Sequence, residues 1–174
     1  MFMSSEPRNF QREVPFADIQ TDPRTWPVYA SREDMDALAP RVSDVLRIDK
    51  LQGDVTLGRK GSDICVSGKV AAEVTRRCTI SLAPMLETIA ESFQFRLTRE
   101  FSEEDALSDE DIDLLEGDEI GLGEVLIQQM CLALTPHPQI AGATVDPDHL
   151  NDAPRDNPFA ELKGLLKEQP GKDE

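Results

Sequence analysis

The chain has 174 residues and a formal net charge of −16, with 34 Asp and Glu against 18 Lys and Arg. This length suits one domain with a well-formed core and leaves little room for a second. A protein this acidic gains nothing from the counterion release that drives ordinary nucleic-acid binding, so a basic partner is favoured. Charges are screened over about 8 Å at physiological salt, so a basic patch further than that from the acidic residues could still contact phosphate.

Short elements are expected in the first part of the chain. Residues 1–13 are polar and predict a loose segment, and Val14–Phe16 favours a short edge strand, where proline is tolerated. Two prolines and a tryptophan predict a loop at residues 23–27. Ser31 and Asp34 have the S-x-x-[DE] spacing of a helix start, and apolar residues follow at helical spacing.

The middle of the chain has the period of two that is typical of β-strands. A first strand from Val45 to Leu57 and a turn at Arg59–Ser62 lead into the clearest strand, from Ile64 to Ile80, where apolar and polar residues alternate. A third strand lies between Pro84 and Leu97, and the connection is too short for a crossover helix, so the pairing is expected to be antiparallel. The alternation leaves one face of the sheet wet, and Gly68 favours a bulge.

An acidic stretch follows the strands. Between Glu100 and Glu124 the chain has twelve Asp or Glu and no Lys or Arg. This composition predicts a solvated, mobile loop at about residues 100–119. Three roles stay open: a mimic of nucleic acid that holds a basic protein, an internal competitor that folds over the basic strands, or a loop that only keeps the protein soluble. The carboxylates assigned to binding a basic partner are Glu103, Glu104, Asp105, Asp109, Glu110, Asp111, Asp113 and Glu116.

Two helices are expected after the acidic stretch. Apolar residues recur at three and four from Leu122 to Leu134 and predict a core helix of about 20 Å. Residues 139–156 are a polar linker, and a short amphipathic helix is expected at 157–168. Together the elements predict a single α+β domain at 14–138 on an antiparallel sheet, open or closed in a barrel-like form. The apolar side of the last helix, which would dock on the sheet or on a partner, consists of Phe159, Leu162, Leu165 and Leu166.

The composition favours neither a metal site nor an enzyme. The cysteines, Cys65, Cys78 and Cys131, form no C-x-x-C pair and have only His137 and His149 as nitrogen partners. We therefore expect no metal, no cofactor and no catalytic residue, with a thiol-dependent hydrolase or nuclease as the alternative. No stretch approaches the roughly 20 apolar residues of a membrane span, so a cytoplasmic protein without a membrane partner is expected.

Three motifs occur along the chain in a fixed order. The stretch Val70–Pro84 runs from a strand through a Cys into a Ser-Leu-x-Pro turn, Gly117–Pro138 leads from acidic residues to Leu-Ala-Leu-Thr-Pro-His-Pro, and Asn157–Ala160 reads Asn-Pro-Phe-Ala. Together they resemble the YceD family of large ribosomal RNA subunit accumulation proteins, in a form similar to alphaproteobacterial members. Two positions depart from the family pattern: Cys78 stands alone where many members have a C-x-R-C pair, and Gly121 replaces a usual Asp.

The resemblance implies a bacterial cytoplasmic factor for accumulation or processing of large-subunit (23S) ribosomal RNA, and it does not imply an enzyme. The expected partner is the large ribosomal subunit precursor, through its rRNA or a basic large-subunit ribosomal protein, and no small-molecule substrate is expected. An acidic escort protein for a basic partner unrelated to rRNA is the alternative. The basic residues assigned to RNA contact lie on two neighbouring strands and are Lys69, Arg76, Arg77, Arg96 and Arg99.

These five cations differ in their expected surroundings. Arg76 falls on the apolar side of its strand and Arg77 on the wet side, so one of the two is expected to pair internally with a carboxylate. No aromatic residue interleaves the basic ones as a stacking platform for single-stranded RNA would require. Direct readout of bases is therefore not expected.

Overall fold

The computed structural model describes residues 9–103, 105–107 and 109–144. The amphipathic helix expected at 157–168, with its apolar side, lies outside the described residues, as do most of the linker and most of the N-terminal segment. The elements in chain order are β1 (Glu13–Pro15), β2 (Arg24–Tyr29), α1 (Arg32–Leu38), β3 (Val45–Lys60), β4 (Asp63–Arg77), β5 (Pro84–Thr98), β6 (Ile112–Leu114), β7 (Glu119–Gly121) and α2 (Leu122–Ala133), with short 3-10 helices at Asn9–Gln11, Phe16–Asp18, Ala39–Arg41 and Asp105–Leu107.

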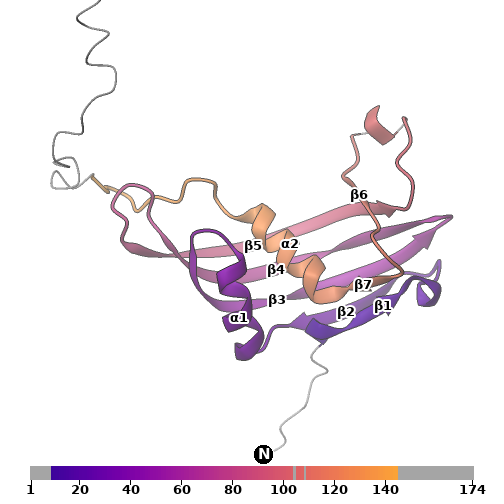
Figure 1. The fold of residues 1–174 in the computed structure, drawn as a ribbon, viewed down its shortest axis with the longest axis horizontal. Helices are drawn as coiled ribbons and strands as arrows, with labels where there is room; N and C mark the ends of the chain where they lie inside the picture. The colour runs from indigo at the N-terminus through magenta and orange to yellow at the C-terminus, as the bar shows by residue number, and fades with distance from the viewer. Residues whose placement is uncertain (1–8, 104, 108, 145–174) are drawn as a thin grey trace, which may run out of the picture.

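A five-stranded sheet in the order β2-β3-β4-β5-β6 forms the body of the protein, and β1 and β7 pair separately as a two-stranded antiparallel ribbon (Figure 1). The predicted α+β class is confirmed. The neighbouring strands from β2 through β5 pair antiparallel, whereas β6 pairs in parallel with β5. The sheet is open, with β2 and β6 at its edges, so the barrel-like form is wrong.

Burial along β4 follows the predicted alternation. Val66, Val70, Ala72 and Val74 are buried on the inner face, and the residues of the opposite parity between them are half-buried or exposed. This is the pattern of an antiparallel sheet with one face on the core and one face in water. The strand ends at Arg77 rather than at Ile80, because the chain turns there and the Leu82 N–H group donates to the Cys78 carbonyl at 3.0 Å.

Two local expectations for the sheet are wrong. The loop expected at residues 23–27 is part of β2, in which Pro27 lies opposite Asp54. Proline fits there because β2 is an edge strand, and one side of it needs no ladder hydrogen bond. The bulge expected at Gly68 is absent from the register of β3 and β4, whose irregularities lie nearer Val45 and Ile48.

Helix α2 crosses the inner face of the sheet and contacts β3, β4 and β5. Its residues Leu122, Leu126 and Met130 are fully buried, which confirms the predicted core helix. Gly121 caps the helix without a side-chain hydrogen bond, since glycine has no side-chain acceptor. The N–H group of Leu122 instead donates to the carbonyl of Arg12 at 3.0 Å. This backbone hydrogen bond satisfies one of the N–H groups that a helix leaves without a partner at its N-terminus.

Gly53 in β3 and Gly68 in β4 lie where a side chain would overlap the backbone of the neighbouring strand. A Cβ atom on Gly53 would lie 2.0 Å from the Lys69 carbonyl oxygen and 2.7 Å from Leu126 Cδ1, and one on Gly68 would lie 1.9 Å from the Asp54 carbonyl oxygen. Contacts this short with backbone cannot be relieved by side-chain movement. Neither position therefore has room for a side chain.

We expect Gly68→Ala to lower the free energy of unfolding by about 3 kcal/mol, because the new methyl group would overlap both the Asp54 carbonyl and the Phe93 ring. Urea unfolding followed by circular dichroism measures the change. Gly58→Ala is the control in the neighbouring strand, where the nearest atom is a Pro23 side-chain carbon at 3.1 Å, and its cost should be smaller. Equal losses in the two variants would contradict the role given to Gly68.

Candidate functional site

Arg76 is a buried cation that joins the sheet to the end of α2. Its side chain is 5% exposed, and Nη1 donates to Glu87 Oε2 and to the Thr135 carbonyl, both at 2.8 Å. The Thr135 N–H group in turn donates to Glu87 Oε1 at 2.8 Å. Burial works to raise the pKa of Glu87, but the bonds from Arg76 and Thr135 hold it below its ordinary value. Arg76 is therefore engaged inside the protein, and its guanidinium is not exposed for the RNA contact assigned to it.

The turn after β4 extends the same junction. Thr79 donates twice to the Pro138 carbonyl, from its N–H group at 2.9 Å and from its hydroxyl at 3.2 Å. Cys78 is fully buried, and its Sγ accepts from the N–H groups of Ser81 at 3.5 Å and Ile140 at 3.4 Å. The Ser81 hydroxyl and then these N–H groups lower the pKa of the Cys78 thiol to about 7. The sulfur is thus an enclosed acceptor that ties two distant segments together.

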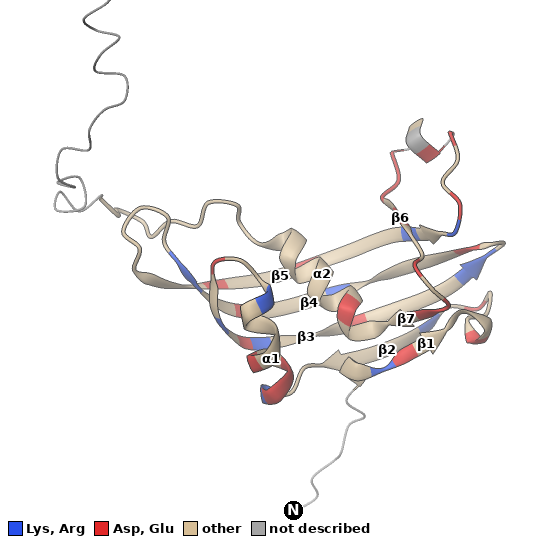
Figure 2. Ribbon diagram, viewed as in Figure 1, with Lys and Arg blue, Asp and Glu red and all other residues tan. Residues whose placement is uncertain are grey.

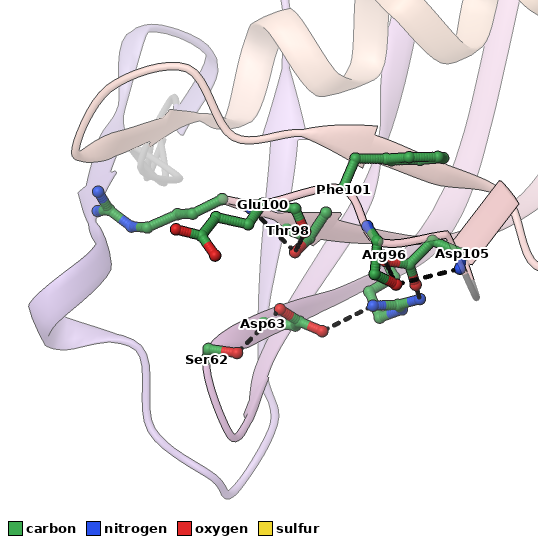
Figure 3. Close-up of a pocket in the computed structure, with 9 residues that line it drawn as sticks. Ser62, Asp63, Arg96, Thr98, Glu100, Phe101 and Asp105 are labelled. Carbon is green, nitrogen blue, oxygen red and sulfur yellow. Dashed lines mark hydrogen bonds and ion pairs between the residues drawn. The ribbon is translucent and has the colours of Figure 1, made fainter.

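Arg96 holds the acidic segment, residues 100–119, against the sheet. Its guanidinium contacts Asp63 at 2.7 Å, Asp105, and Glu110 at 3.3 Å, and Figure 3 shows Asp63 and Asp105 on either side of it. Asp105 also accepts from the Ser102 hydroxyl at 2.7 Å. The Ser102 hydroxyl and Arg96 lower the pKa of Asp105 to about 2, so this contact is present above about pH 4 and is lost as the pH falls through about 2. We call this group the Arg96 clamp.

The acidic segment has more regular structure than expected of a mobile loop. The N–H group of Arg96 donates to the Asp111 carbonyl at 2.9 Å, and that of Leu115 donates to the Thr98 carbonyl at 2.8 Å, so β6 is bonded at both ends. Its acidic residues recur along the chain between β5 and β7 (Figure 2). Glu104 lies outside the described residues. The assigned carboxylates that are exposed are Glu103, Asp109, Glu110, Asp111, Asp113 and Glu116.

Arg99 is also engaged with nearby groups. Its guanidinium lies 4.8 Å from the centroid of the Phe16 ring, and that of Arg59 lies 4.6 Å from the same centroid. The Nη2 atom of Arg99 also contacts Asp118 at 2.7 Å. Guanidinium groups over an aromatic face gain electrostatic attraction from the ring. Part of the expected basic surface therefore fastens the segment before β7 to the chain near β1.

Lys69 and Arg77 are the two assigned cations that stay exposed without a recorded ion pair among the described residues. Lys69 lies opposite Asp54 in the neighbouring strand. Eight residues separate Lys69 from Arg77 along β4, which corresponds to about 26 Å at roughly 3.3 Å per residue. This distance exceeds the screening length at physiological salt. The five assigned cations therefore do not form one continuous basic face.

Three contact residues were missed from the sequence: Asp63, Glu87 and Thr135. A signal for Glu87 existed, because it shares the inward parity of β5, and a cation at Arg76 on the inward side of β4 requires a partner. No such signal existed for Thr135, which is distant in sequence. Across the described residues no group of three or more His, Cys, Asp or Glu could hold a metal ion. No helix within them is long and apolar enough to span a membrane.

The fold and its contacts define an α+β protein in which the half-buried Arg96 and the exposed Arg99 hold an acidic segment against the sheet. A comparison with known families matches residues 66–166 to the family described as Large ribosomal RNA subunit accumulation protein YceD. The match covers more than half of the chain and includes both segments that meet at Arg76. The chain belongs to the YceD family, as the motifs predicted. Searches among curated proteins and among solved structures gave no match.

We expect Arg76→Ala to lower the free energy of unfolding by about 3 kcal/mol, because the partly buried Glu87 carboxylate would keep only the Thr135 N–H group. Arg77→Ala is the matched control one residue later, and since Arg77 is exposed its effect should stay within about 0.5 kcal/mol. Chemical unfolding of both variants decides the matter. Similar effects of the two substitutions would contradict the structural role of Arg76.

We expect Arg96→Ala to release the acidic segment while the rest of the fold is kept. Cleavage by a Glu-specific protease after Glu103 and Glu110 should become several-fold faster, because Asp105 and Glu110 lose their anchor. Mass spectrometry of timed digests locates the cuts. Lys69→Ala removes a cation elsewhere on the sheet and should leave the cleavage pattern unchanged. Unaltered cleavage in the Arg96 variant would show that the clamp does not hold the segment.

Proposed function

We propose that this protein is a non-enzymatic factor in ribosome biogenesis that supports accumulation or processing of large-subunit ribosomal RNA by holding a basic large-subunit ribosomal protein on its acidic segment. The description of the family supports the role in ribosome biogenesis. The distribution of charge among the described residues supports the class of partner. It also favours the mimic of nucleic acid over the other roles considered for the segment.

The observation that carries this proposal is the internal neutralisation of the arginines. Arg76 is sealed against Glu87, and Arg96 is surrounded by three carboxylates. A phosphate would have to displace these carboxylates before it could contact either guanidinium. Asp109, Asp111 and Glu116 are exposed and have no ion pair recorded among the described residues, and the net charge of −16 attracts a basic protein from a distance.

Anchoring of the acidic segment should strengthen the binding of a partner to it. The Arg96 clamp and the pairing of β6 with β5 fix the backbone from which the carboxylates extend. A partner that binds a fixed surface avoids the entropy cost of ordering a loop. At Arg96 the acidic segment also folds over a basic strand residue, as the internal-competitor role would require, because Asp105 and Glu110 contact its guanidinium.

The alternatives fit the structure less well. A thiol-dependent hydrolase or nuclease would need Cys78 to be accessible, but its sulfur is enclosed and accepts from backbone N–H groups, and His137 is exposed. Direct RNA binding would depend on Lys69 and Arg77, which are too far apart to act on one phosphate. Escort of a basic partner unrelated to rRNA lacks the support that the family description gives to ribosome biogenesis.

The triple variant Asp109→Asn, Asp111→Asn and Glu116→Gln tests the proposal with a purified basic protein of the large ribosomal subunit as the probe. We expect about tenfold weaker binding at low salt, from roughly 0.5 kcal/mol for each exposed charge, and a shallower salt dependence. The control variant Asp18→Asn, Asp22→Asn and Glu33→Gln removes the same charge from other exposed positions. Fluorescence anisotropy at two salt concentrations measures both.

Two results would contradict the proposal. Equal weakening by the two triple variants would mean that only net charge matters and that the acidic segment is not a site. Tight binding of a purified 23S ribosomal RNA fragment, abolished by Lys69→Ala together with Arg77→Ala, would favour direct RNA contact instead. Both outcomes are read by the same anisotropy titration, in which the labelled probe and the protein variant are exchanged.

A further inference from the structure

The outer edge of β5 is open over its middle. Strand β6 pairs only with Arg96, Leu97 and Thr98, at one end of β5 (Figure 1). Between Ala90 and Gln94, β5 has β4 on one side and, within the part of the chain that the structure describes, no strand on the other. Chain that could have continued β6 in this direction is instead held at the Arg96 clamp.

The alternation of the strand identifies which backbone groups face this edge. The N–H group of Arg96 and the carbonyl of Thr98 bond toward β6. The register of β4 with β5 is unbroken, so every second residue directs its backbone groups to the same side. The N–H and C=O groups of Ala90, Ser92 and Gln94 therefore face the open edge, where another strand could pair with them.

A groove lies beside this edge. Its volume is about 530 Å³, and it is lined from β5 by Phe93 and Phe95, from β6 by Ile112, and from α2 by Leu132. Leu132 is 73% exposed. An extended chain on the β5 edge would direct alternate side chains into this groove, and large apolar side chains would cover the exposed leucine.

The charges around the edge select a basic occupant. Between Ala90 and Gln94, β5 contains Glu91 but no Lys or Arg, and the groove adds Asp111 and Asp113. Natural proteins commonly protect an open edge with Lys or Pro, and neither occurs here after Pro84. A second copy of this chain would bring Glu91 against like charges, which disfavours self-pairing.

We propose that the open edge of β5 binds an extended, basic polypeptide segment as an added β-strand, with apolar side chains of that segment in the groove of Phe93, Phe95 and Leu132. This inference rests on the proposed function, because it assigns the binding mode of the same basic partner. Backbone pairing at Ala90, Ser92 and Gln94 supplies the register. The carboxylates of Glu91, Asp111 and Asp113 recognise Lys or Arg.

A pair of substitutions at Ser92 tests this binding mode. Ser92→Pro removes one N–H group that faces the open edge and leaves the β4 ladder intact, whereas Ser92→Ala keeps the N–H group. The probe is a fluorescein-labelled octapeptide of alternating Lys and Val, read by anisotropy, alongside the same peptide with alternate backbone nitrogens methylated. We expect at least tenfold weaker binding to Ser92→Pro, wild-type binding to Ser92→Ala, and no binding of the methylated peptide.

Hydrogen exchange on the wild-type protein supplies a measurement that does not depend on the folding of a variant. Binding of the Lys-Val peptide should slow amide exchange at Ala90, Ser92 and Gln94. Unchanged exchange there would overturn the proposal, and so would self-association of the wild-type protein that Ser92→Pro abolishes. If Ser92→Pro binds the basic ribosomal protein normally but the triple variant of the acidic segment does not, edge pairing is wrong and the proposed function stands. If both variants bind it normally, both proposals fall.

Discussion

The contact of Arg76 with Glu87 and Thr135 is the constraint on which the rest of the arrangement depends. A guanidinium that is 5% exposed requires a carboxylate and a second acceptor, and both are recorded at 2.8 Å. Glu87 comes from the adjacent strand, whereas Thr135 comes from the chain just after α2. This one cation therefore fixes the end of the helix over the sheet, and through α2 it sets where the preceding acidic segment must arrive.

Two of the arginines on the sheet are buried or half-buried, whereas most carboxylates of the acidic segment are exposed. Arg76 on β4 and Arg96 on β5 are engaged in internal contacts with carboxylates, and across the chain Asp and Glu outnumber Lys and Arg. A protein that needed its sheet to bind phosphate would leave those guanidinium groups free. The observed arrangement instead uses cations to hold an anionic surface in place, which is the opposite of the usual basis for binding nucleic acid.

Local pattern predicted the elements whose residues carry their own signal. The alternation of β4, the capping box of Ser31 and Asp34, and the apolar spacing of α2 are all confirmed. β2 and β6 were missed, because each is an edge strand whose existence depends on a long neighbour and not on its own sequence. The partners of Arg76 and Arg96 were missed for a related reason: a parity argument indicates that a buried cation needs an acid, but only the register selects which one.

The Arg96 clamp and the open edge of β5 are two consequences of one geometry. Arg96 faces the outer side of the sheet while its backbone N–H group bonds to the Asp111 carbonyl, so this one residue holds the chain just before β6 through both its backbone and its side chain. Glu110 contacts the guanidinium, and the recorded pairing of β6 with β5 begins two residues later, at Ile112. Within the part of the chain that the structure describes, the β5 edge before Arg96 has no paired strand, and Asp111 and Asp113 line the groove beside it. The contacts that neutralise Arg96 therefore lie at the end of the same strand edge that is open over its middle.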